Sequence, residues 1–156
     1  MQITRQADYA VRAVRHLAIL EKQYLEENPE MKSVEPARRR KDEKNMAATS
    51  LIAKEQDIPA SFLAKIISTL LKARILETSR GARGGVSLAR PPEEITLLEV
   101  VEAIDGPILL NECVDDSSNC TNEEDCPLKP IWSEAQAVLV DKLRSTTFDQ
   151  ISNGRK

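Results

Sequence analysis

Apolar side chains recur at intervals of three and four residues in several segments of the chain, the pattern of helices that bury one face. The first such segment follows Thr4, a residue type that caps helices, and continues to about Leu25. A second extends from about Thr49 to Gln56. A third, starting at Pro59 and ending near Lys72, has as its apolar face Leu63, Ile66, Ile67, Leu70 and Leu71. The pattern predicts a mainly α fold.

The second and third helices are joined by a turn typical of helix-turn-helix units. Asp57 is a residue type that adopts the left-handed conformation of tight turns, Ile58 is expected in the core, and Pro59 fixes the start of the next helix. The exposed face of the third helix is small, polar and basic, with Ser61, Ala64, Lys65, Ser68 and Lys72. Such a face suits the major groove of double-stranded DNA.

A short antiparallel hairpin is predicted after the third helix. Residues 75–78 and 86–89 read as strands around the glycine-rich turn 79–85, which carries Arg80 and Arg83. The two arginines are expected at a minor groove or on phosphates. A nucleotide site is disfavoured, because the glycine-rich loop joins two strands rather than a strand and a helix. Residues 1–90 therefore read as a winged helix-turn-helix domain, against the alternative of a purely structural hairpin with a solvated basic loop.

Residues 91–156 are predicted to hold a helix capped by Thr96, a cysteine loop at 113–126 and a long helix after Pro127 and Pro130. The apolar stripe of the long helix comprises Ile131, Trp132, Ala135, Val138, Leu139 and Leu143. It favours a dimerisation helix, and packing against the chain's own first helix is the alternative. A last short helix is expected at 147–151. Residues 26–45, with Pro29, Pro36 and a basic run, read as an inserted linker.

Charge is unevenly distributed along the chain. Residues 47–90 hold seven Lys or Arg against three Asp or Glu, whereas residues 91–156 hold five against fourteen. A basic middle segment suits contact with phosphates, and an acidic end suits a separate sensor.

All three cysteines, Cys113, Cys120 and Cys126, lie in one polar loop with spacers of six and five residues. Three soft thiolate ligands at this spacing indicate metal binding, with one coordination position left open. Charged residues rather than a signal-peptide core follow the first five residues, so a cytoplasmic protein is expected. In such a reducing compartment, an odd number of cysteines argues against a disulfide framework. The acidic residues of the loop disfavour reactive thiolates unless a cation is present.

Other classes of protein are disfavoured. No apolar run approaches the length needed to span a membrane. The single histidine, His16, has no evident nucleophile partner, so the chain is not expected to be an enzyme. His16 is expected to be packed or solvated rather than a metal ligand. Asp8 lies in the first turns of a helix, where a carboxylate often only complements the helix dipole.

In combination, these residues resemble the family of winged-helix regulators that includes IscR, NsrR and RirA. The resemblance extends over nearly the whole chain and is carried by Met1-Gln2-Ile3-Thr4 with Asp8-Tyr9-Ala10-Val11, by the segment from Ile58 to Leu63, by Arg80-Gly81 with Gly84-Gly85, and by the three-cysteine loop. It implies a homodimer on a pseudo-palindromic operator, with an iron-sulfur cluster in the loop that sets DNA affinity. It also implies that Ser61, Phe62 and Lys65 face bases or phosphates and that Arg80 faces the minor groove.

The chain departs from the family in three places. Lys129 stands where IscR-like members place a histidine ligand. Ala64 occupies a position that is acidic in IscR. The segment 26–45 is longer than the connection that the family usually has at this place. Asp8 matches a carboxylate that some NsrR-like members donate across the dimer as the fourth ligand. The resemblance thus implies a repressor with Cys113, Cys120, Cys126 and Asp8 on a 4Fe-4S cluster, favoured over 2Fe-2S.

The expected signal is nitric oxide, with iron or cluster supply second, because a cluster that is incompletely bound by thiolates is open to attack. The alternatives are a metal-free thiol-redox regulator that pairs two of the cysteines, and a small iron-sulfur electron-transfer protein.

Overall fold

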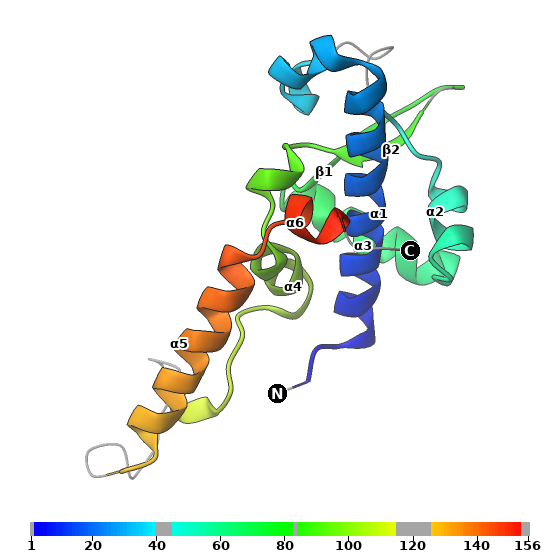
Figure 1. Cartoon of the computed structure of the whole chain (residues 1–156). Coiled ribbons are helices and arrows are strands. Elements are labelled where there is room, and N and C mark those ends of the chain that lie inside the picture. The colour runs from blue at the N-terminus through cyan, green and yellow to red at the C-terminus, as the bar shows by residue number, and fades with distance from the viewer. Residues whose placement is uncertain (1, 40–44, 83, 115–125, 154–156) are drawn as a thin grey trace.

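The computed structural model describes residues 2–39, 45–82, 84–114 and 126–153. Over these ranges the chain is mainly helical, with one two-stranded sheet, so the predicted fold class is confirmed. Helix α1 (Arg5–Glu27) runs through a head of short helices and the sheet, and α5 (Lys129–Ser145) extends away from that head (Figure 1).

Helix α1 is amphipathic, as its spacing predicts, and one face is fully buried along most of its length. The Thr4 hydroxyl accepts a hydrogen bond from the Ala7 amide at 3.1 Å, which caps the first turn. The short 3-10 helices η1 (Pro29–Ser33) and η2 (Pro36–Arg38) occupy much of the predicted linker.

A buried ion pair fastens this segment to α1. Arg39 Nη1 lies 2.6 Å from Glu21 Oε1, and their side chains are 2% and 6% exposed. The Arg39 guanidinium also stacks over the Tyr24 ring at 5.5 Å, and its Nε donates to the Val34 carbonyl at 3.2 Å. Sequence reasoning missed this pair, because nothing in the local sequence of either residue signals that the two meet.

Helices α2 (Thr49–Glu55) and α3 (Ala60–Lys72) form the predicted helix-turn-helix. Asp57 has φ 51°, the expected left-handed conformation, and Ile58 is buried beneath the turn. The buried face of α3 comprises Leu63, Ile66, Ile67 and Leu70, which leaves its polar face in solvent.

The wing is an antiparallel pair, β1 (Leu76–Ser79) and β2 (Gly85–Leu88), in the register Leu76 to Leu88 and Ser79 to Gly85. A third segment completes it, because Ala47 and Val86 exchange backbone hydrogen bonds of 2.8 and 2.9 Å. This bridge ties the start of the helix-turn-helix to the wing. It also explains Gly85, since a Cβ there would lie 2.3 Å from the Ala47 carbonyl oxygen.

Replacing Gly85 with alanine is therefore expected to displace the Ala47 segment and to lower the free energy of unfolding by about 1–3 kcal/mol, the usual range for overpacking. Urea denaturation measures the change. Ala82→Ser, at an exposed position of the wing tip, is the control and should be neutral. If Gly85→Ala and the wild type were equally stable, the Ala47 segment would have to move away from the added Cβ at no cost, which would contradict this prediction.

The C-terminal part of the chain returns to the head. Helix α4 (Leu97–Asp105) begins with a full capping box between Thr96 and Glu99 and ends at Gly106, whose φ is 81°. The short helix η4 (Pro92–Glu94) precedes it. Helix α6 (Phe148–Ser152) places the fully buried Phe148 in the same core cluster as residues of α1 and α3. The hydrophobic core is thus continuous across residue 90.

No helix among the described residues is both long and apolar enough to cross a bilayer.

Candidate nucleic-acid interface and cysteine site

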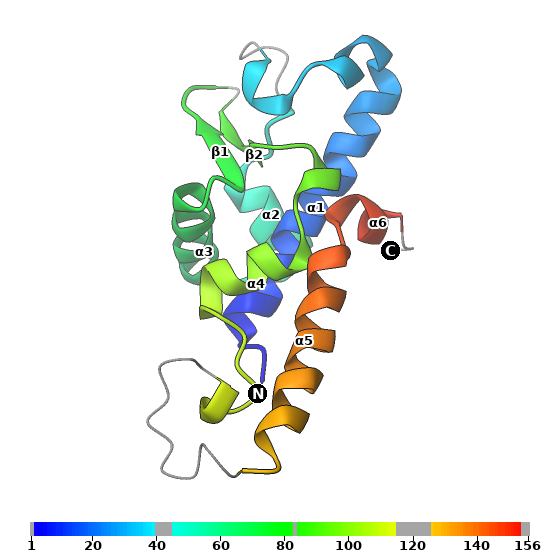
Figure 2. The ribbon, with the colours of Figure 1, turned by 90° about the vertical axis from the view of Figure 1, so that its left-hand side faces the viewer.

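Three predicted DNA contacts, Ser61, Phe62 and Lys65, lie on the exposed face of α3. The buried residues of α3 fix the direction of this face, because they pack into the main core. Phe62 is unusual for a surface position, since 43% of a large apolar side chain is exposed. Helix α3 and the wing lie on the same side of the molecule (Figure 2), so a single DNA duplex could meet both.

The wing continues this surface. Arg80 is exposed at the end of β1 and is followed by Gly81 with φ 110°. Arg83 lies outside the described residues. Between α2, α3 and the wing is an open groove of about 540 Å³ whose lining includes Thr49, Ser50, Thr78 and Ser79. These hydroxyl side chains were missed by sequence reasoning, since they come from two elements, α2 and β1, that only the fold brings together.

His16 joins α1 to the helix-turn-helix. It is buried, with Nδ1 3.2 Å from Gln56 Nε2 and Nε2 3.2 Å from Glu55 Oε2. Burial lowers the pKa of His16 below its usual 6.5, and the nearby Glu55 carboxylate opposes that shift. The neutral ring accepts from Gln56 through Nδ1, which places its proton on Nε2, beside Glu55.

Because the pKa of His16 is lower in the folded than in the unfolded chain, the unfolded state binds more protons as pH falls through 6.5. The stability associated with the neutral ring is complete above this pH and is lost below it. We expect the free energy of unfolding to fall more steeply between pH 7 and 5 for the wild type than for His16→Asn. Unfolding curves across this range measure the difference, and parallel profiles would contradict the assignment.

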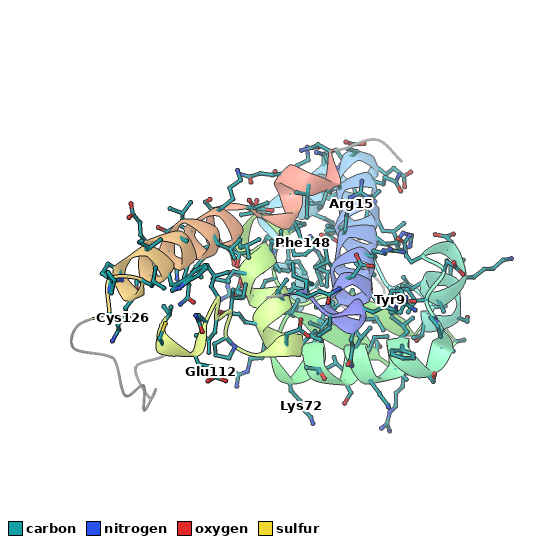
Figure 3. The ribbon with its side chains drawn as sticks, turned by 90° about the horizontal axis from the view of Figure 1, so that it is seen from below. Tyr9, Arg15, Lys72, Glu112, Cys126 and Phe148 are labelled. Carbon is teal, nitrogen blue, oxygen red and sulfur yellow. The ribbon has the colours of Figure 1, made fainter. Side chains whose placement is uncertain are left out.

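Two of the three cysteines lie at one end of α5. Cys113 belongs to the short helix η5 (Glu112–Val114), which packs against α5, and Cys126 comes just before α5 begins. Figure 3 shows Glu112 and Cys126 at this outer end. The Leu110 amide donates to Gln136 Oε1 of α5 at 3.0 Å, which fixes the chain leading to Cys113. Both thiols are free of disulfide bonds and half-buried.

Cys120 lies outside the described residues. Within the described ranges, no group of three His, Cys, Asp or Glu side chains is close enough to hold a metal ion. The donors nevertheless suit iron-sulfur chemistry, because thiolates are the usual ligands of such clusters and the two described thiols are accessible and unpaired.

Asp8 lies on the exposed first part of α1, where its carboxylate is 2.8 Å from Arg12 Nη2. The start of α1 is tied to the end of α4, since Asp105 accepts hydrogen bonds from the Thr4 hydroxyl at 2.6 Å and the Thr4 amide at 3.0 Å. Asp105 directly precedes the segment that leads to Cys113. Asp105 therefore connects the start of α1 to the segment that leads to Cys113.

An exposed recognition helix beside a two-stranded wing defines a winged helix-turn-helix DNA-binding protein. A family model described as an iron-dependent transcriptional regulator, Rrf2, matches residues 37–154. The chain belongs to the Rrf2 family. It is accordingly a DNA-binding transcriptional regulator and not an enzyme, and the predicted resemblance is confirmed.

Three similar proteins illustrate the family. An HTH-type transcriptional regulator, NsrR of Shouchella clausii, is 29% identical over 97% of this chain and 88% of its own length. The structure of CymR, the global cysteine regulator of B. subtilis, matches 100% of this chain and 99% of that chain with TM-score 0.70 and 20% identity. IscR of T. potens covers 99% of this chain and 89% of its own, with TM-score 0.66 and 21% identity. The two structures support the fold.

Proposed function

We propose that this Rrf2 regulator is a homodimeric repressor whose operator affinity is set by an iron-sulfur cluster held by Cys113, Cys120 and Cys126. The fourth ligand is Asp8 of the partner subunit, and the cluster is of the 4Fe-4S type. The signal is nitric oxide, with iron or cluster supply as the second candidate.

The observation that carries this proposal is the placement of Cys113 and Cys126. Both ends of the cysteine loop are attached to one end of α5, through η5 and the Gln136 hydrogen bond on one side and the helix start on the other. Cys120 lies between them in the sequence, with spacers of six and five residues. An iron-sulfur cluster, when bound, supplies reactivity towards nitric oxide and iron status.

Asp8 is a suitable fourth ligand because its carboxylate is half exposed and its only described ion pair is with the equally exposed Arg12. An exposed pair of this kind is worth at most about 1 kcal/mol, so a metal site can displace it at little cost. Lys129, by contrast, is a cation at the start of α5 and is a poor ligand for iron.

On the DNA side, Ser61, Phe62 and Lys65 read base edges or phosphates, while Arg80 and Arg83 of the wing hold the backbone or the minor groove. The support is the shared orientation of α3 and the wing and the exposure of the α3 residues. The operator is expected to be pseudo-palindromic, because a twofold dimer presents two equivalent recognition helices.

The dimer is inferred from α5, which has no fully buried residue along its 17 positions. Leu139, Val140 and Leu143 pack against α4 and Ile108, but another side of the helix exposes Ile131 and Val138, at 59% and 67%. An exposed apolar stripe of this length on a regulator indicates a partner surface. A second copy of α5 fits it by symmetry.

We expect Val138→Asp to convert the dimer into a monomer, because it places a charge in the middle of the stripe. Ala137→Asp, about 100° round the helix, is the matched control and should remain dimeric. Light scattering coupled to gel filtration distinguishes the two. A dimeric Val138→Asp protein would exclude this face as the interface.

The proposed function is tested by purifying the protein without oxygen and measuring iron, acid-labile sulfide and the absorption spectrum, followed by titration with nitric oxide. We expect about four iron and four sulfide ions per chain for a 4Fe-4S cluster, and bleaching of the spectrum by nitric oxide. Absence of iron and sulfide would contradict the proposal. If peroxide then produced a disulfide between two of the cysteines, the metal-free thiol-redox regulator would replace the proposed function. A protein that contained the cluster but bound no DNA would instead indicate an electron-transfer protein.

A further inference from the structure

A cavity of about 100 Å³ lies between the last turns of α1, the segment that holds η1 and η2, and η4. Its lining includes Glu21 and Leu25 of α1, Val34 and Arg39 of that segment, and Pro92 of η4. The helices η1 and η2 lie at one end of the molecule and the cysteine segment at the other (Figure 2). Neither the proposed cluster site nor the proposed DNA face uses the residues of this cavity.

The buried part of the lining carries a charged pair. The side chains of Glu21 and Arg39 are 6% and 2% exposed, and Arg39 Nη1 lies 2.6 Å from Glu21 Oε1. The guanidinium directs its other nitrogens to backbone carbonyls, with Nε donating to Val34 at 3.2 Å and Nη2 to Met31 at 3.5 Å. The Nη1 contact is an ion pair without hydrogen-bond alignment, and Glu21 Oε1 accepts no hydrogen bond from the described residues. Because a carboxylate accepts several hydrogen bonds, Glu21 retains capacity for a further donor.

The remaining lining combines charged side chains at the surface with aliphatic walls. Lys32, Glu35 and Glu93 are exposed, and Glu35 also pairs with Arg38 outside the cavity at 3.0 Å. The described lining residues together carry three carboxylates against two cations, which favours a positive ligand. The walls are formed by one leucine, one valine and three prolines. An aliphatic group of a ligand would therefore be removed from water on these walls.

The volume limits the size of a ligand. An apolar cavity of about 150 Å³ holds benzene, so a cavity of about 100 Å³ has room for roughly four or five non-hydrogen atoms. We propose that this cavity binds a small primary alkylammonium ion, whose nitrogen donates to the Glu21 carboxylate and whose aliphatic part lies against Leu25, Val34 and Pro92. An ammonium group suits the site because it has three donors and no acceptor. The site is separate from the proposed cluster and does not depend on it.

Butylammonium is the probe, because it is of this size and has one ammonium group. Methyl groups of leucine and valine labelled with ¹³C report on Leu25 and Val34, whose resonances are assigned from Leu25→Met and Val34→Ile proteins. In a titration at constant ionic strength, both resonances are expected to shift to saturation with a Kd of roughly 0.1–10 mM, the scale for so small a ligand. Butyrate, which is of similar size but carries a carboxylate, should not shift them. The absence of a saturable shift, or equal shifts with butyrate, would overturn the proposal.

Glu93→Gln and Glu94→Gln form a matched pair. Both glutamates are exposed on η4, but only Glu93 lines the cavity. Glu93→Gln is expected to weaken butylammonium binding by about 2- to 5-fold, the scale of an exposed charge pair. Glu94→Gln should leave the affinity unchanged. Equal affinities of the two variants would show that the probe binds elsewhere and would overturn the assignment.

Glu21→Gln tests the buried carboxylate. We expect the affinity for butylammonium to fall by about 10-fold or more, the scale of a hydrogen bond to a charged group. Wild-type affinity in folded Glu21→Gln protein would contradict the proposal. The substitution also leaves Arg39 without its counter-ion, which can destabilise the fold, so a thermal unfolding curve accompanies the titration. If Glu21→Gln is unfolded, the comparison of Glu93→Gln with Glu94→Gln decides the matter.

Discussion

Cys113→Ser protein purified without oxygen is expected to contain less than about a tenth of the iron and sulfide of the wild type and to have lost the response of DNA binding to nitric oxide. The reason is chemical, because serine replaces a soft thiolate with a hard, weakly acidic hydroxyl that iron in a sulfide cluster holds poorly. The fold should survive, since Cys113 is only half-buried and lies outside both hydrophobic clusters. Iron and sulfide assays with a thermal unfolding curve measure both outcomes.

Ser133→Ala on α5 is the matched control for this substitution. It removes a hydroxyl from α5, the helix against which the Cys113 segment packs, and should leave the iron content unchanged. Wild-type iron content in Cys113→Ser would contradict the ligand assignment, whereas loss of iron together with loss of folding would show that Cys113 is structural.

The largest effect on stability is expected from Phe148→Ala. Phe148 is fully buried in the main core, and its amide donates to the Ile95 carbonyl at 3.0 Å, so it fastens α6 and the start of α4 to α1. Removing a buried phenylalanine ring costs about 3–5 kcal/mol, through lost burial and the cavity left behind. For a chain of this size we expect the midpoint of thermal unfolding to fall by roughly 10 °C or more.

The other phenylalanine is the natural comparison. Phe62→Ala removes the same atoms from a position that is 43% exposed, and we expect a loss of stability below about 1 kcal/mol with weaker DNA binding. Phe148→Ala should instead lose much stability but keep its DNA affinity at temperatures where the variant is folded. Equal stability losses for the two variants would mean that α6 is not part of the core.

The sequence was sufficient to predict the elements that repeat a strong local pattern. The apolar stripe of α3, the left-handed Asp57 and the glycine-rich wing turn each follow from residue types at fixed spacing, and all are present in the structure. The cysteine loop was equally visible, because its three thiols are close together in the chain.

Contacts between distant segments could not be predicted in this way. The Arg39–Glu21 pair is buried because the 3-10 segment folds back onto α1, and nothing in either local sequence signals this. The bridge from Ala47 to Val86 and the return of Phe148 to the core depend on the whole topology. The same holds for the contact of Tyr9 with Phe62, which joins two helices separated by the entire inserted segment.

The most direct test of the central claim compares one preparation with itself. The probe is a labelled duplex that the wild-type protein selects from a random-sequence pool. The DNA affinity of protein loaded with its cluster without oxygen is measured at one fixed salt concentration, and is measured again after treatment with nitric oxide. If DNA affinity is set by the cluster, removal should weaken binding by about 5- to 150-fold, the usual range of coupling between two sites. The same affinity before and after complete cluster loss would contradict the account.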